Sequence, residues 1–413
     1  MAAPPNILWI VTTQWRGQAL GYAGDANART PWLDGLASEA VNYIHAVTPH
    51  PLGPQARAAL LTGKLCPENG VAGYWDPLPL DARTVAHALN DRGYATAFFG
   101  KWHLAPRDRS VPFVGEGHAK MIVPSARRGG FGLWEGFEGG FLLNDPWLHG
   151  TRLETPRKFK GYQADVLADR AGTWGREQQQ RRTADGKPWF CLVSLEAPHP
   201  PYHAPAPHAQ EMKPAEIRLR NNVPTGGPIE RQARDELAGY YAHIEATDRV
   251  VGKLLAEVDL TETIVVFTSV HGDMQGSHGL FRKAWPYEES VRVPLLVRFP
   301  RRPGAADREQ APGENREPVS LVDLPHMAVA WAEGREWHCR RDHALISMPS
   351  ATDIALQCPE AWRGFRSAKH KLVLRADGRP WLYFDLERDP LELTNLAEDP
   401  ARGAEVAELV RLM

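Results

Sequence analysis

"NILWIVTT", residues 6–13, is the stretch that decides the fold class. The run is short and its centre is entirely apolar, which is typical of a β-strand buried on both faces of a sheet. Further strand-like segments are ATAFFGKWHL (95–104), PWFCLVSLEAPHPPYHAP (188–205), TIVVFTSVHGD (263–273) and VPLLVRFP (293–300). Segments with helical spacing lie among them, at 30–41 and 236–258. This alternation predicts an α/β sandwich with a central, mostly parallel sheet.

The end of the chain has a different pattern. Segment 301–317 is rich in Pro, Gly and charge and predicts a surface loop. Segment 369–390 predicts an antiparallel hairpin that turns at Asp377-Gly378. We therefore expect an α/β domain over residues 1–330 and a small C-terminal α+β subdomain over 331–413.

Composition excludes several classes of function. The chain has 413 residues and a net charge of −2, which argues against a nucleic-acid partner. Its four cysteines are scattered, so neither a disulfide framework nor a thiolate metal site is expected. Neither a signal-peptide pattern nor an apolar run of transmembrane length occurs, which predicts a cytoplasmic protein without a membrane partner. The sequence leaves the oligomeric state open.

Polar residues follow several of the predicted strands directly. They are Thr13-Gln14, Lys101, His103, His199 and His271. In open α/β sheets, functional loops lie beyond the carboxyl ends of the strands, so we expect these side chains to meet at one edge.

Motifs along nearly the whole chain resemble the sulfatase family of the alkaline phosphatase superfamily, which includes arylsulfatases and phosphonate monoester hydrolases. The resemblance is carried by PNILWIVTTQWRGQALGYAG, RAALLTGKLCPENGV, GYATAFFGKWHL, GYQADVLADRA, APHPPY, SVHGDMQGSHGLFRKAWPYEESVRVPLLVRFP and LYFDLERDPLELTNLAED. It implies an alkaline-phosphatase-like fold and hydrolysis of sulfate or phosphonate esters. It also implies a divalent metal and a nucleophile that is serine or a cysteine converted to formylglycine.

Three positions depart from the chemistry that the resemblance implies. Thr13 and Val270 stand where metal carboxylates are expected, and Gly53 stands where the nucleophile is expected. Glycine has no side chain with which to attack. Calcium and magnesium require oxygen ligands, several of them charged, so Gln14 and His271 alone make a poor cage. We therefore expect no metal and no cofactor; Asp273 is a weak candidate for a substitute ligand.

Other positions match family groups that surround the ester anion. Arg57, Lys101, His103, His199, Lys283 and His271 are the predicted anion-binding residues. Lys101, His103, His199 and Lys283 are also the predicted catalytic residues, with a histidine as general acid or base. Loss of two carboxylates together with a divalent metal leaves the charge of the pocket nearly unchanged, so the pocket should still attract an anion.

Three hypotheses follow for the function. The leading one is a sulfatase-like protein that binds a sulfated or phosphorylated small molecule without metal. It either only binds this molecule or catalyses a non-hydrolytic reaction, an elimination or intramolecular displacement, with sulfate as leaving group. The second is a working ester hydrolase with an atypical site, for which Thr13 or Thr48 is the candidate nucleophile. The third is a pseudoenzyme that acts through a protein partner.

Overall fold

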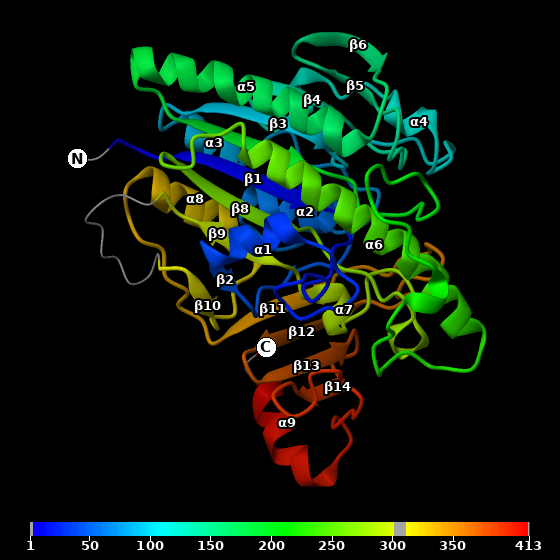
Figure 1. The fold of residues 1–413 in the computed structure, drawn as a ribbon. Coiled ribbons are helices and arrows are strands. Elements are labelled where there is room, and N and C mark those ends of the chain that lie inside the picture. The colour runs from blue at the N-terminus through cyan, green and yellow to red at the C-terminus, as the bar shows by residue number, and fades with distance from the viewer. Residues whose placement is uncertain (1–2, 301–310, 412) are drawn as a thin grey trace.

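The centre of the molecule is a large sheet that lies between helices (Figure 1). The computed structural model describes residues 3–300, 311–411 and 413. Within these residues, ten strands pair in the order β10-β2-β9-β8-β1-β7-β3-β4-β5-β6. Strands β8, β1, β7, β3 and β4 are mutually parallel, and antiparallel pairs occur toward both edges. The predicted α/β fold with a mostly parallel central sheet is confirmed.

The strands of this sheet agree in part with the apolar runs of the sequence: β1, β3, β7, β8 and β9 lie in predicted segments, whereas the other five were not predicted. Their bounds are β1 (Asn6–Thr12), β2 (Val41–Tyr43), β3 (Ala95–Lys101), β4 (Leu133–Phe137), β5 (Trp147–Gly150), β6 (Leu153–Lys158), β7 (Trp189–Ser194), β8 (Thr263–Ser269), β9 (Leu295–Arg298) and β10 (Gly313–Asn315).

Helices cover both faces of the sheet, which explains why β1 is apolar on both sides. Leu8 and Ile10 enter the core beneath α1, α5 and α6. Trp9 and Val11 enter the opposite core, which α2, α3 and α8 close. The helices are α1 (Pro31–Ser38), α2 (Gly53–Thr62), α3 (Val85–Asn90), α4 (Glu116–Ala119), α5 (Gln163–Asp185), α6 (Pro228–Leu255), α7 (Glu288–Val291), α8 (Leu324–Ala332) and α9 (Gly403–Val410). None of these described helices combines the length and the apolarity needed to cross a bilayer.

A second, smaller sheet forms the C-terminal part of the molecule (Figure 1). Its strands are β11 (His343–Met348), β12 (Trp362–Ser367), β13 (His370–Arg375) and β14 (Pro380–Asp385), paired antiparallel in this order. The predicted hairpin over 369–390 is the β13–β14 pair. Helix α8 packs on the core of the large sheet. The division into units at residue 330 stays a prediction.

The predicted surface loop over 301–317 is only partly comparable with the structure. Residues 301–310 lie outside the described part of the chain. Gly313–Asn315 is strand β10, which pairs parallel with β2 at the sheet edge. The loop prediction is wrong there, because a three-residue edge strand of largely exposed polar residues carries no apolar signal.

Candidate functional site

The carboxyl ends of β1, β3, β7 and β8 meet around a buried pocket of about 250 Å³. Its inner end is lined by Thr13, Gly53, Lys101, His103, His199, His271 and Lys283. The structure thus brings together most of the residues predicted from the sequence. Arg57 and Val270 lie behind this wall rather than on it.

Both Nη groups of Arg57 bind protein atoms, whereas its buried Nε has no hydrogen-bond partner among the described residues. Its Nη1 donates to the Lys101 carbonyl at 3.1 Å and to Ser194 Oγ at 2.6 Å. Its Nη2 donates to Thr13 Oγ1 at 2.8 Å, while that hydroxyl donates to the Leu195 carbonyl at 3.0 Å. Burial lowers the pKa of Arg57 to about 10, so the guanidinium stays charged at neutral pH. The two Nη groups of Arg57 thus support the pocket floor, and its predicted direct contact with an anion stays a prediction.

Lys101 already has a carboxylate partner inside the protein. Its Nζ lies 2.7 Å from Glu196 Oε1, and both side chains are almost completely buried. Glu196 also accepts from Gln163 Nε2 at 3.1 Å. Burial lowers the pKa of Lys101 to about 8, and the Glu196 carboxylate limits that fall. Much of the charge of this lysine is thus balanced before any anion enters.

Sequence reasoning missed Glu196, although it stands three residues before His199 in the motif SLEAPHPPY. The signal was an acidic residue directly beyond a buried strand, at the edge where the lysine was expected.

Lys283 is held differently, by neutral acceptors. Its Nζ donates to Gln14 Oε1 and to His199 Nε2, the latter at 3.0 Å. Burial lowers its pKa to about 7, opposed chiefly by the Asp273 carboxylate. Neither Lys283 nor Arg57 forms an ion pair with any carboxylate of the described chain. These two cations are the ones left to balance a bound anion.

The three histidines of the pocket are neutral at pH 7. Burial, with Lys283 and Lys101 nearby, lowers the pKa of each well below 6.5. His199 Nδ1 lies 2.7 Å from the Pro200 carbonyl and so carries the proton, which leaves Nε2 to accept from Lys283. His271 donates in the same way from Nδ1 to the Gly272 carbonyl at 2.9 Å. Neutral rings suit acceptor or base roles and argue against the general-acid role.

The ring of His103 fills the space beside Gly53. A Cβ on Gly53 would lie 2.8 Å from His103 Nδ1, closer than such atoms approach one another. That ring nitrogen is buried and has no hydrogen-bond partner among the described residues. A serine or cysteine at position 53 would therefore require the ring to move. The present position of the ring thus suits a glycine at position 53.

The alternative nucleophiles are poorly placed. The proton of Thr13 is committed to the Leu195 carbonyl, and its oxygen accepts from Arg57. Thr48 donates to the His50 carbonyl at 3.2 Å and does not line the pocket.

The residues at the family's metal position do not fit a hard divalent cation. Val270 is fully buried in the apolar core. The oxygen of Gln14 is bound by the Lys283 ammonium. The Asp273 carboxylate accepts from Tyr202 Oη at 2.9 Å, from the backbone N–H groups of Gln275 and Arg282 at 3.0 and 2.9 Å, and from Gln14 Nε2. With four donors on its two oxygens, the Asp273 carboxylate offers calcium or magnesium no free charged ligand.

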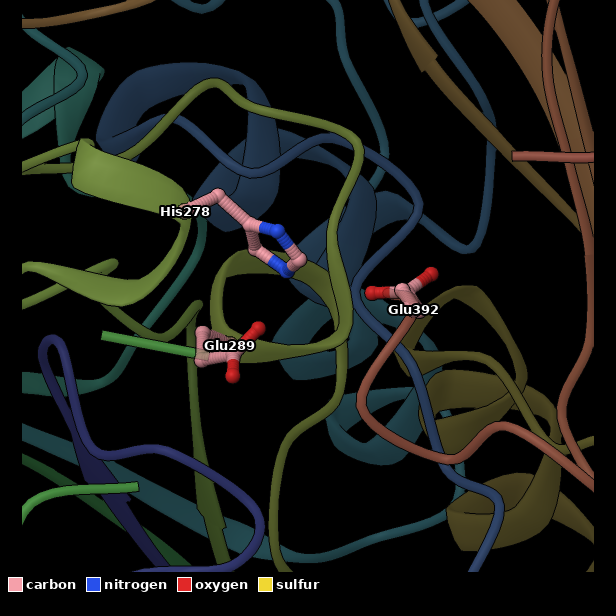
Figure 2. A group of neighbouring side chains, drawn as sticks. All are labelled: His278, Glu289 and Glu392. Atoms are coloured by element: carbon pink, nitrogen blue, oxygen red, sulfur yellow. The ribbon is translucent and has the colours of Figure 1, made fainter. Parts of the chain in front are cut away.

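One other group in the described chain has the spacing of metal ligands: His278, Glu289 and Glu392 (Figure 2). Their ligand atoms lie within 4.8 Å of one another. Each carboxylate already has a partner from the protein, however, although Glu289 Oε2 is buried without a hydrogen bond. Lys371 Nζ lies 2.5 Å from Glu392, and Asn222 Nδ2 donates to Glu289 at 2.8 Å. This group joins β13 to the large domain through balanced charges and is not assigned to a metal.

The molecule is thus an α/β sandwich with lysine and histidine side chains gathered in a pocket at the carboxyl edge of its parallel strands, the edge where such folds carry their functional loops. The family model described as Sulfatase matches residues 5–334, and the chain belongs to the sulfatase family. It is 34% identical to the ulvan-active sulfatase of Formosa agariphila over 96% of this chain and 78% of that protein. It is 26% identical to an arylsulfatase of Clostridium perfringens over 95% of this chain and 90% of that protein.

A solved structure agrees with this assignment at the level of the fold. The phosphonate monoester hydrolase of Agrobacterium radiobacter superposes with a TM-score of 0.73 at 22% identity. The match covers 99% of this chain and 94% of the hydrolase.

Proposed function

We propose that this protein binds the sulfo or phospho group of a small-molecule ester without a divalent metal, and that it lacks the hydrolytic route of its family. Gly53 supplies no nucleophile, and a side chain at this position would require the His103 ring to move. Covalent hydrolysis of this kind depends on the nucleophile and on charge stabilisation by the metal. Losing both removes the reaction while leaving a cationic pocket.

The observation that carries the proposal is the place of Lys283. Its ammonium binds the oxygen of Gln14, the residue that follows the lost carboxylate position Thr13. A lysine ammonium is a compact point charge with three donors. Two of its donors face protein acceptors, so one remains for an anion oxygen. The pocket thus keeps a cation where the metal would otherwise supply charge.

A second candidate function follows from the neutral imidazole of His103. A substrate that carries its own hydroxyl can undergo intramolecular displacement in such a pocket. The hydroxyl loses its proton to the imidazole, its oxygen attacks the carbon that bears the sulfate, and the carbon–oxygen bond to sulfate breaks. The products are a cyclic ether, sulfate and one proton. Lys283 would stabilise the charge on the departing group.

Calorimetric titration of sodium sulfate into chelator-treated protein tests the binding proposal. We expect binding without metal, no gain on adding calcium, and weaker binding by Lys283→Met. Lys64→Met, at an exposed lysine paired with Glu68, is the matched control and should leave binding unchanged. Binding that requires calcium, or equal binding by both variants, would contradict the proposal and favour an atypical hydrolase or a role through a protein partner.

The second candidate is tested with a hydroxyl-bearing sulfate monoester in ¹⁸O-labelled water. Displacement within the substrate releases sulfate that contains no label. Labelled sulfate would show attack of water on sulfur and so exclude this candidate.

A further inference from the structure

The outer half of the pocket has a different chemistry from the inner half. Beyond the lysines and histidines, the wall is formed by Tyr74, Phe113, Val114, Pro201, Ile354 and Ala355. These residues come from three separate loops of the large domain and from the segment between β11 and β12 of the small sheet. The pocket is therefore completed by the C-terminal part of the chain.

Two of these apolar side chains face water. Phe113 is 38% exposed and Val114 is 63% exposed. Phe113 is nevertheless held in place, because its ring stacks on Trp75 at 5.5 Å and meets the edge of Tyr74 at 5.8 Å. The Tyr74 ring in turn lies 5.5 Å from that of His103. An ordered aromatic surface thus leads from the anion site to the mouth of the pocket.

Charge in this outer half is already neutralised. Among the described residues that line the outer half, Arg282 carries a charge. Its Nη1 and Nη2 donate to the two carboxylate oxygens of Glu236, at 2.5 and 3.1 Å. Behind the wall, Arg107 lies 4.6 Å from the Tyr74 ring and 3.5 Å from Glu138. The polar groups left for a saccharide are the Tyr74 hydroxyl and Gln357, whose buried Oε1 has no hydrogen-bond partner among the described residues. Two such groups serve one or two hydroxyls of a sugar ring, and each further buried hydroxyl without a partner weakens binding.

We infer that the organic part of the bound ester is an uncharged apolar ring system rather than a saccharide; this inference rests on the proposed anion binding. The anionic head lies by Lys283 at the inner end, and the ring covers Phe113 and Val114. Covering these side chains removes apolar surface from water and so favours a ligand of this shape.

The test compares four ligands by calorimetry on the chelator-treated full chain: inorganic sulfate, methyl sulfate, 2-naphthyl sulfate and glucose 6-sulfate. We expect 2-naphthyl sulfate to bind at least about tenfold more tightly than methyl sulfate, from the apolar area that its rings bury. Glucose 6-sulfate should gain nothing over methyl sulfate. Glucose 6-sulfate binding as tightly as the naphthyl ester would overturn the inference.

Variants separate the two parts of the pocket. Val114→Ser and Phe113→Ser should each remove most of the advantage of the naphthyl ester and leave inorganic sulfate binding unchanged. Ile122→Ser is the matched control, since Ile122 is 51% exposed but does not line the pocket. An equal effect of the control and the wall variants would refute the inference.

The outcomes for the two proposals are distinct. If methyl sulfate binds and 2-naphthyl sulfate binds no more tightly, the inference of an apolar ring system is rejected and the proposed anion binding stands. No binding of inorganic or methyl sulfate rejects the proposed function and, with it, this inference.

Discussion

The pH dependence of sulfate binding should be set by Lys283, and Lys283→Met is the perturbation that reveals it. Burial lowers the pKa of this lysine to about 7, opposed by the Asp273 and Glu196 carboxylates and reinforced by Lys101 and Arg282. The pocket histidines are already neutral in this range because their pKa values lie well below 6.5. Loss of charge above pH 7 therefore begins at Lys283.

The expected size follows from the linkage between proton and anion binding. A bound anion favours the ammonium, so above a pKa of about 7 the free protein must take up a proton to bind. Affinity for sulfate should then fall by about tenfold per pH unit until the pKa of the bound state is passed. Lys101, with a pKa of about 8, adds a second decline at higher pH. Lys283→Met should bind more weakly at pH 6.5 and stay nearly flat up to about pH 8.

The assay is calorimetric titration with sodium sulfate between pH 6 and 9 at constant ionic strength, since added salt screens charge contacts. The stability of the protein without ligand should change with pH in the opposite direction to its sulfate affinity. An unfolded lysine keeps its proton to about pH 10.4, so between pH 7 and that value the unfolded chain binds more protons and stability from this group rises with pH. An equal pH slope in the native protein and in Lys283→Met would refute the reasoning.

Three further predictions concern stability and chemistry. Lys101→Met should lower the free energy of unfolding by about 3–5 kcal/mol, because it leaves the Glu196 carboxylate buried and unpaired, and adding Glu196→Gln should restore part of the loss in denaturant titrations. Gly53→Ala should lower the melting temperature and shift the His103 resonances, since its Cβ meets that ring at 2.8 Å, whereas Gly175→Ala on helix α5 meets nothing within 4 Å and should be neutral or stabilising. Purified protein should contain no stoichiometric divalent metal by elemental analysis, and aryl sulfate turnover should equal the background rate with or without calcium; one metal per chain or robust turnover would show that the site has been misjudged.

The fold was largely predictable because its central strands are buried on both faces. Leu8 and Trp9 face opposite cores, so the alternation that marks a half-exposed strand disappears and a continuous apolar run remains. Strands β2, β4, β5, β6 and β10 escaped prediction, and β10 looks like a loop in the sequence because its three polar residues lie largely exposed at an edge. The predicted site positions came from motif order, and the topology brought them together at the carboxyl ends of the strands.

The partners of these residues were not predictable in the same way. Whether a lysine in a motif faces a ligand or a buried carboxylate depends on side-chain geometry, and Glu196 decides this for Lys101. The same holds for Arg57, whose Nη groups bind Thr13, Ser194 and a backbone carbonyl while its buried Nε has no partner among the described residues. Motifs in the sequence predict where the site residues lie, whereas the charge that each residue has left for a ligand follows only from its side-chain contacts in the structure.

That balance argues for a site adapted to work without metal rather than one left over from a hydrolase. A relic with unpaired cations would be expected to lose them, since a buried charge without a partner is costly. Here Lys101 has Glu196, and Arg57 and Lys283 have oriented neutral acceptors that keep them in place without cancelling their charge. An incoming sulfo or phospho group would therefore meet two cations held by the fold. The lowered pKa of Lys283 then makes the anion itself the partner that restores its charge, so binding and protonation should rise and fall together.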